Sequence, residues 1–253
     1  MIKNPVSAEG YFLKQHKLCR PLLSVYTRKK EAEDLHQLRV SIKKIKAILL
    51  MLDKLEGNFG FDKTFAPYKI LFKQLAPIRN EMLQAEKTKN EPVSTQQKNK
   101  HRLRIAAYNK KLKQAAPGYL KSITEKLPET LQYLSKVKHK DIYPYCKKLL
   151  RKIKANWKDI KTDDELHKYR KQLKQLLYCS SLLTSKQKDK LLSSKEHKRI
   201  DKLQDEIGQW HDNILLLTEI EKGTFKVSPT FQQTIKKETE LMIKEIRKKG
   251  DKL

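Results

Sequence analysis

Apolar residues recur every three or four positions through most of this chain, with charged residues between them. This spacing places the apolar side chains on one face of a helix, as in an amphipathic helix. Val and Thr show little of the alternation that predicts strands, and the whole chain contains only 7 glycines. The pattern therefore predicts an all-α protein.

Short segments rich in glycine, proline or polar residues separate the predicted helices. The helices are expected over residues 8–27, 34–54, 61–87, 97–113, 119–137, 143–159, 163–183, 186–221 with a possible break, and 229–249. Connectors are expected at 57–60, at 87–98 with Pro92 and Ser94, at 138–144 and at 222–229. The third connector is the expected boundary between two halves.

Helix starts are marked by polar residues at the spacing of a capping box, in which two side chains bond the backbone of each other's residue. Thr162 and Glu165 match this pattern. Asp34 and Gln37 are expected to act in the same way before an earlier helix.

One motif occurs twice. Residues 35–43 and residues 166–174 share the pattern Leu-His-x-apolar-Arg-x-x-apolar-Lys. On a helix the His, Arg and Lys of each copy fall within an arc of about 60° and form a cationic stripe. The first stripe is His36, Arg39 and Lys43, and the second stripe is His167, Arg170 and Lys174. Each stripe borders the apolar face of its helix, so we expect the two stripes to line a shared groove.

The duplication continues beyond these two helices. Arg79 and Asn80 in the first half, and His211 and Asp212 in the second, follow their motif histidines at intervals that differ by one residue. A duplicated helical unit, in which a long partner helix follows each motif helix, explains this spacing. Asp212 is expected to orient a motif cation, because a carboxylate is a poor ligand for an anion.

The charge of the chain indicates the class of partner. The 253 residues include 57 Lys and Arg against 29 Asp and Glu, which gives a formal net charge of +28 at pH 7. Such a charge favours a polyanionic partner, and nucleic acid, an anionic membrane surface and inorganic polyphosphate are the candidates. The longest apolar run, residues 47–52, is too short to span a bilayer, and the first residues lack the apolar core of a signal peptide. We therefore expect a cytoplasmic protein.

The sequence shows few features that would indicate disulfides, catalysis or metal binding. Cys19, Cys146 and Cys179 lack CxxC spacing and are expected to be free thiols. The sequence contains no P-loop, HExxH or GxSxG motif and no clustered carboxylates for Mg²⁺, so we expect no enzymatic activity, no cofactor and no metal. Trp157 and Trp210 are expected to be packed. A basic segment is expected to be exposed; it comprises Lys98, Lys100, His101, Arg102 and Arg104.

The duplicated motif resembles the CHAD family, the conserved-histidine α-helical domain. The resemblance rests on residues 35–46 and 75–80 in the first half and on residues 166–178 and 203–212 in the second. It implies a single domain over residues 1–253, with two pseudo-symmetric antiparallel four-helix subdomains of about 8–137 and 143–250. It also implies a basic cleft between them that binds inorganic polyphosphate without catalysis, and association with polyphosphate granules is compatible with this.

The sequence departs from the family pattern at a few positions. Asn80 stands where the family usually has Asp, and Lys43 and Lys44 replace the commoner arginines. The second copy has Gln175 and Leu177 where the first has Lys44 and Lys46. We therefore expect the first half to contribute more charge. Lysine retains the attraction to phosphate but lacks the two-pronged hydrogen bonding of arginine.

The candidate polyphosphate ligands are the two stripes and one flanking lysine of each. They are His36, Arg39, Lys43, Lys46, His167, Arg170, Lys171 and Lys174. A polymer without bases is recognised by repeated charge-assisted hydrogen bonds, which Lys and Arg donate. A solvated charged face is the alternative for the cations, and a structural hydrogen bond is the alternative for both histidines. Nonspecific nucleic-acid binding at low salt is the alternative function.

Overall fold

The computed structural model describes residues 7–89, 91, 95–224 and 226–252. Every regular element in these residues is a helix, which confirms the all-α prediction. Pro92 and Ser94 of a predicted connector, and the N-terminal residues 1–6, lie outside the described residues. The chain divides into unit 1, which comprises Met1–Lys89 and Lys98–Ile142, and unit 2, which comprises Asn90–Gln97 and Tyr143–Leu253. The predicted subdomain limits and the single domain that joins them stay predictions.

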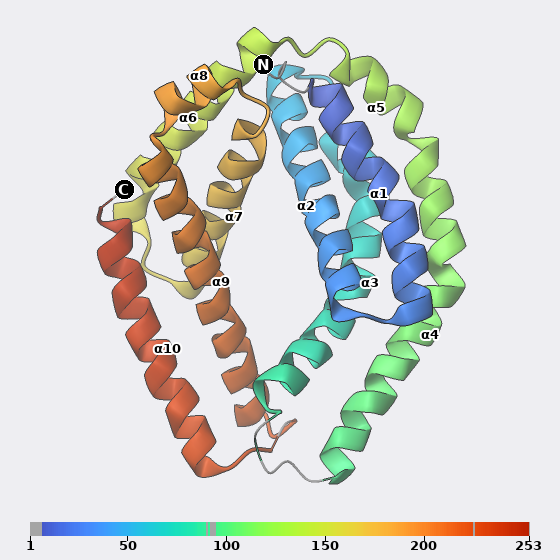
Figure 1. Ribbon diagram of the computed structural model, residues 1–253, viewed down its shortest axis with the longest axis vertical. Coiled ribbons are helices and arrows are strands. Elements are labelled where there is room, and N and C mark those ends of the chain that lie inside the picture. The colour runs from blue at the N-terminus through green and yellow to red at the C-terminus, as the bar shows by residue number, and fades with distance from the viewer. Residues whose placement is uncertain (1–6, 90, 92–94, 225, 253) are drawn as a thin grey trace. The chain divides into compact units, whose positions relative to one another are not determined.

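Unit 1 contains the first motif copy. Its helices are α1 (Ala8–Lys29), α2 (Ala32–Leu55), α3 (Phe61–Lys87), most of α4 (Thr95–Glu125) and α5 (Leu127–Leu134). Helices α1 and α2 lie side by side, α3 packs on α2, and α4 runs beside α1 (Figure 1). The apolar face predicted for the motif helix forms the core of this unit: Leu35, Leu38, Ile42, Ile45 and Leu49 are all buried.

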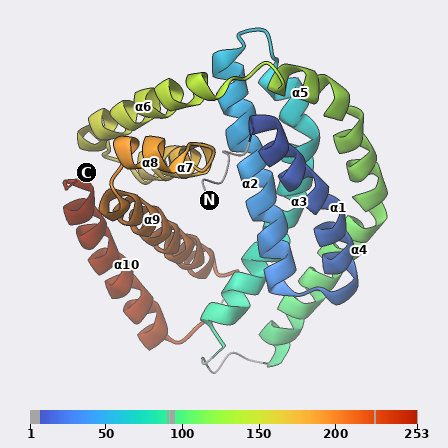
Figure 2. The same ribbon diagram turned by 45° about the horizontal axis from the view of Figure 1, so that its top comes forward.

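Unit 2 contains the second motif copy. Its helices are most of α6 (His139–Asn156), α7 (Asp163–Ser180), α8 (Ser185–Leu191), α9 (Ser194–Glu221) and α10 (Pro229–Gly250), with one 3₁₀ turn at Trp157–Asp159. Helix α9 packs against both α7 and α10 (Figure 2). The apolar face of the motif helix is again the core, with Leu166, Tyr169, Leu173 and Leu176 buried.

Both tryptophans are buried, as predicted. Trp157 donates its indole N–H to Asp251 at 2.8 Å and lies against Gly250. A Cβ atom at position 250 would overlap the indole ring, so glycine lets the end of α10 approach Trp157 closely. Trp157 also packs beside Tyr169 of the motif helix, with ring centroids 5.1 Å apart. The second motif helix is thereby fixed to the C-terminal end of the chain.

Two predicted boundaries are wrong at a proline, and the single helix predicted over residues 119–137 is divided near Lys126, between α4 and α5. The predicted break between residues 113 and 119 does not exist, because α4 continues through Pro117 to Glu125. The predicted connector at 138–144 is also helical from His139 onward, with Pro144 inside α6. A proline inside a helix costs about 3 kcal/mol. Buried apolar residues on both sides of each proline favour one continuous helix: Leu112 and Ile123 in α4, and Ile142 and Cys146 in α6.

The helix start predicted from capping residues is confirmed in unit 2, whereas the one predicted in unit 1 is wrong. Thr162 and Glu165 form the predicted capping box at the start of α7. In the predicted helix 186–221, the break lies between α8 and α9, where Ser193 and Glu196 form another capping box. Asp34 and Gln37 do not cap α2, which begins earlier, at Ala32. Acidic residues in its first turn favour this earlier start, because they interact well with the N-terminal end of the helix dipole.

None of the described helices has a stretch that is both long and apolar enough to cross a membrane.

Candidate anion-binding site

The cations of the first stripe lie on the side of α2 that faces α3. Arg39 Nη1 donates to the backbone carbonyl of Phe72 at 3.3 Å, and its Cζ lies 4.1 Å from the centroid of the Phe72 ring. Lys43 Nζ lies 5.9 Å from the same centroid, and Lys46 Nζ lies 5.7 Å from the centroid of Phe65. An aromatic face positions a cation without neutralising its charge. Three predicted ligands are therefore aligned along the seam between α2 and α3.

Arg170 of the second stripe makes the equivalent contact more tightly. Its Nε donates to the backbone carbonyl of Gln204 on α9 at 2.8 Å. Its guanidinium lies flat against Gly208, where a Cβ atom would be 2.3 Å from Nη2. Only glycine leaves room for this contact in the observed position, because real Cβ atoms do not approach other heavy atoms so closely. Gly208 therefore determines where the guanidinium of Arg170, which extends from α7, lies against α9.

The two arginine contacts correspond in register. Arg39 bonds a carbonyl 33 residues further along the chain, and Arg170 bonds one 34 residues further. This register aligns Phe72 with Gln204 and Ala76 with Gly208. A one-residue difference also separates the intervals from the motif histidines to Arg79 and His211. The same contact in both units is what a duplicated helical unit predicts.

The residues around the aligned pair differ in charge. In unit 2 the Gln204 side chain donates to Asp201 Oδ1 at 3.0 Å and to Asp205 Oδ1 at 2.8 Å. The aligned positions in unit 1 carry Lys69 and Lys73, both exposed. The helix packed on the second stripe therefore carries two carboxylates at the positions where the helix packed on the first stripe carries two lysines.

Lys174 is influenced by these carboxylates. Burial, and then the charge of Arg170, lower the pKa of the Lys174 ammonium, while Asp205 and Asp201 act in the opposite direction. A partly buried ammonium beside an arginine needs an anion to stabilise it. In unit 2, Asp201 and Asp205 offset only part of this effect, since the pKa of Lys174 stays below its ordinary value.

The two motif histidines are in different surroundings. His36 is exposed on α2. His167 is partly buried and stacks on His211, with ring centroids 4.3 Å apart and an angle of 23° between the rings. Burial first, then the charges of His211, Lys171 and Arg170, lower the pKa of His167 to about 4, and Asp164 acts in the opposite direction. His167 is therefore a neutral imidazole at pH 7, as expected for a histidine among cations.

The Nδ1 atom of His167 is buried and has no hydrogen-bond partner among the described residues. A neutral imidazole carries its proton on one nitrogen, so the ring has a donor or an acceptor to offer on that side. Either a ligand contact or a structural role for this ring is compatible with the geometry.

The flanking residues are less enclosed than the arginines. Lys46 and Lys171 are exposed on α2 and α7. Lys44 is partly buried on α2, and its burial and the charge of Lys14 on α1 lower the pKa of its ammonium. Tyr178 is partly buried on α7. Arg39, Lys43, Arg170 and Lys174 thus occupy one helix face per unit, with Lys46 and Lys171 at the solvent edge of that face.

The basic segment at the start of α4 is exposed as predicted, with one exception. Lys98, Lys100, Arg102 and Arg104 are exposed, but His101 is 7% exposed and its imidazole bonds Glu81 of α3. Arg104 Nη1 also lies 3.3 Å from Glu81 Oε1. His101 was expected to be exposed with its neighbours, and this prediction is wrong because position 101 falls on the face of α4 that packs on α3.

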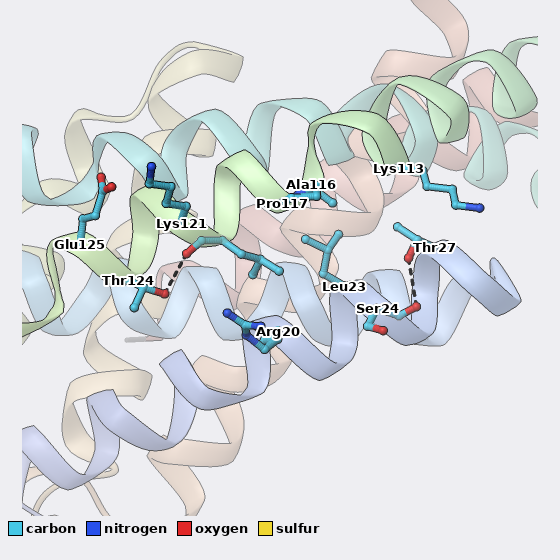
Figure 3. A pocket seen from close by; sticks show the side chains of 11 residues that line it. Arg20, Leu23, Ser24, Thr27, Lys113, Ala116, Pro117, Lys121, Thr124 and Glu125 are labelled. Carbon is cyan, nitrogen blue, oxygen red and sulfur yellow. Dashed lines mark hydrogen bonds between the residues drawn. The ribbon is translucent and has the colours of Figure 1, made fainter.

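A groove between α1 and α4 in unit 1, shown in Figure 3, was not predicted from the sequence. It has a volume of about 730 Å³, an apolar floor that includes Leu23 and Pro117, and basic residues Arg20, Lys113 and Lys121. The hydroxyls of Thr27 and Thr124 donate to carbonyls within their own helices. No local pattern marks such a groove, since it depends on how far apart two helices pack.

The three cysteines are free and buried, which confirms that they form no disulfide. Burial raises the pKa of Cys19 and of Cys146 to about 12, so both are protonated and unreactive at neutral pH. Within the described residues, no group of three or more His, Cys, Asp and Glu side chains is placed to hold a metal ion.

Comparisons with known proteins agree with the all-α fold. A family model described as the CHAD domain matches residues 20–221. A solved structure, the crystal structure of the CHAD domain from the plant Ricinus communis, superposes with a TM-score of 0.67 at 15% sequence identity. The match covers 98% of this chain and 93% of the plant chain. No curated protein matches the chain. At this level of identity the structural likeness establishes the fold.

Proposed function

The chain belongs to the CHAD domain family, and we propose that it binds inorganic polyphosphate through the cationic stripes of α2 and α7. The observation that supports this most directly is the paired arginine contact. Arg39 and Arg170 are each held by a backbone carbonyl of the following long helix, at equivalent places in the two copies. A bond to a carbonyl fixes the position of a guanidinium, and the planar guanidinium carries five N–H donors whose geometry suits phosphate.

The chemistry of the stripe residues suits a chain of phosphates. Arg39 and Lys43 are one helical turn apart, as are Arg170 and Lys174. Neighbouring phosphates of polyphosphate share a bridging oxygen, so one short stretch of polymer can accept hydrogen bonds from both cations of a stripe. The exposed Lys46 and Lys171 extend each stripe toward solvent. His36 and His167 complete the proposed set as hydrogen-bonding groups or as supports for the arginines.

The proposal concerns binding without catalysis, as the absence of known catalytic motifs in the sequence predicts. That both stripes line one shared groove also stays a prediction from the sequence. Nonspecific binding of nucleic acid is the second candidate function, because the net charge of +28 attracts any polyanion at low salt. The two functions differ in whether total charge or the position of charge determines affinity.

The test compares two quadruple charge reversals of the full chain. Replacing Arg39, Lys43, Arg170 and Lys174 by Glu should abolish binding of long-chain polyphosphate at about 0.15 M salt, where charges more than about 8 Å apart are screened. The matched control replaces Lys98, Lys100, Arg102 and Arg104 by Glu, which changes the net charge equally. Affinity is measured by calorimetry or by fluorescence anisotropy of labelled polyphosphate.

We expect the control variant to lose less than about tenfold in affinity, since its charges act only at long range. Circular dichroism checks that both variants are folded. Equal losses in the two variants, together with duplex DNA competing as well as polyphosphate per unit charge, would contradict the proposal and support nonspecific anion binding.

A further inference from the structure

The ring of Phe72 on α3 lies beside both cations of the first stripe. The Cζ atom of Arg39 lies 4.1 Å from the centroid of this ring, and Lys43 Nζ lies 5.9 Å from the same centroid. Arg39 also donates to the backbone carbonyl of Phe72. One partly buried residue thus faces both of the cations that α2 contributes to the proposed polyphosphate test.

The two cations repel each other. Arg39 and Lys43 are one helical turn apart and carry the same charge. Lys69 and Lys73, which precede and follow Phe72 on α3, are exposed and add further positive charge nearby. Repulsion of this kind favours conformations in which the two long side chains spread apart. Gathering them when an anion binds then costs conformational entropy, which weakens binding.

An aromatic ring can oppose this repulsion without cancelling the charge. Its negative face attracts cations, although the ring carries no net charge. A carboxylate in the same place would attract the cations more strongly, but it would offset part of their charge and repel an incoming anion. Phe72 therefore suits a site in which two cations must be held together and still attract phosphate.

Unit 2 shows how an arginine is held where the aligned residue is not aromatic. That residue is Gln204, and Arg170 lies against Gly208 with a bond of 2.8 Å to the Gln204 carbonyl. In unit 1 the residue aligned with Gly208 is Ala76, and the carbonyl bond of Arg39 is longer, 3.3 Å. An alanine leaves no room for the flat contact that glycine allows. The ring supports the arginine of unit 1 where glycine supports that of unit 2.

We propose that Phe72 is a positioning residue for polyphosphate binding, whose ring holds Arg39 and Lys43 side by side before the ligand arrives. This inference rests on the proposed function, since it concerns the same stripe. The ring acts through the two cations and not on the ligand itself. Affinity for polyphosphate should therefore depend on the ring, even though its removal changes no charge.

The test is Phe72→Leu in the full chain, which keeps an apolar side chain and the backbone carbonyl but removes the ring. We expect the affinity for long-chain polyphosphate at about 0.15 M salt to fall about fivefold. Phe72→Tyr keeps a ring and should bind within about twofold of wild type. The matched control, Phe231→Leu, makes the same substitution at a partly buried phenylalanine of α10 and should also bind within about twofold.

A second background separates positioning from general damage to unit 1. When Arg39→Gln and Lys43→Gln are already in place, adding Phe72→Leu should change the affinity by less than about 1.5-fold, because the two cations that the ring holds are absent. A loss of packing would instead lower the affinity by the same factor in both backgrounds.

NMR spectroscopy observes the placement of the arginine directly. The ring current of Phe72 should shift the side-chain signals of Arg39 upfield in the free protein. The shift should remain when long-chain polyphosphate saturates the protein, because a positioned guanidinium stays on the ring while it binds.

The inference is overturned if wild type binds polyphosphate and Phe72→Leu binds it equally well, or if Phe72→Tyr is as weak as Phe72→Leu. Equal effects of Phe72→Leu in the two backgrounds, or loss of the Arg39 shift on binding, would overturn it too. Wild-type protein that fails to bind polyphosphate would contradict the proposed function itself, and the inference would fall with it.

Discussion

The two copies of the motif hold their arginines in the same register, but the residues packed beside the two arginines differ in charge. In unit 1, Arg39 and Lys43 share the face of Phe72, and the aligned neighbours on α3 are lysines. In unit 2, Arg170 lies on Gly208, and the neighbours on α9 are Asp201 and Asp205. The first copy concentrates positive charge, whereas the second offsets part of its own charge within the protein.

Two copies of one sequence motif can therefore lie in surroundings of different charge. Both copies satisfy the pattern of His, Arg and Lys on the motif helix. The charge that an incoming anion meets also depends on the helix packed beside the motif, and α3 and α9 have opposite charges at the aligned positions. Separate perturbation of each copy therefore measures how far the two have diverged.

The largest effect is expected from reversing the charges of one stripe at a time. Arg39→Glu with Lys43→Glu should weaken polyphosphate binding about 100-fold, and Arg170→Glu with Lys174→Glu about tenfold, because the second pair is already partly offset by carboxylates. Titrations at about 0.15 M salt give both affinities. Lys236→Glu with Lys237→Glu, two exposed positions on α10, controls for net charge.

Thermal unfolding of the same variants should show the opposite order. The second pair should lose about 2 kcal/mol, because Arg170 donates a charge-assisted bond in a partly buried position, and the first pair about 1 kcal/mol. Equal losses of affinity in the two pairs would show that the neighbouring charges do not distinguish the copies.

A smaller effect is expected from replacing Gly208, against which Arg170 lies, by alanine, the residue at the aligned position of unit 1. Gly208→Ala gains about 1 kcal/mol of helix propensity but displaces Arg170 from the Gln204 carbonyl, a bond worth about 1.5–3 kcal/mol. The free energy of unfolding should therefore fall by about 1 kcal/mol, measured by urea denaturation. In unit 1 the aligned residue is already Ala76, and the Arg39 bond is longer, 3.3 Å against 2.8 Å.

Repeating Gly208→Ala in a protein that already carries Arg170→Ala separates the gain in helix propensity from the loss of the Arg170 hydrogen bond. Without the guanidinium, Gly208→Ala should stabilise the protein by about 1 kcal/mol, since only helix propensity remains. Stabilisation by Gly208→Ala in the presence of Arg170 would show that the close approach of glycine and arginine has no energetic importance.

The smallest effect is expected from the stacked histidines of unit 2. The pKa of His167 is about 4 in the fold, below the value of about 6.5 expected when unfolded, so the unfolded chain binds more protons between these two pH values. The contribution of His167 is complete above about pH 6.5 and is lost as the pH falls toward 4. Because the ring is only partly buried, solvent screening limits the effect to less than about 1 kcal/mol.

Urea denaturation of wild type and His167→Gln at pH 7 and pH 5 measures this linkage. Wild type should lose more stability between the two pH values than the variant does, and His36→Gln serves as the comparison for removing the exposed imidazole of unit 1. The same loss in wild type and His167→Gln would mean that burial and the neighbouring charges do not keep His167 neutral.

Local periodicity was sufficient to predict most helices and the cationic stripes. The apolar faces of α2 and α7 are buried as predicted, because a helix with one continuous apolar face must cover it. Periodicity failed where packing overrode a local signal. Pro117 and Pro144 predict helix breaks, yet buried residues on both sides keep each helix continuous. The burial of His101 was likewise missed, because only contact with Glu81 reveals which side of α4 is covered.

The amino-acid sequence by itself determined the helical class, the duplication and the identity of the stripe residues, since these depend on neighbours within a few turns of one helix. Only the tertiary structure decided that Arg39 lies on Phe72, that Arg170 fits against Gly208 and that His167 stacks on His211. These contacts join residues more than 30 positions apart. Their geometry depends on how two helices pack, and a one-dimensional pattern does not contain that distance or angle.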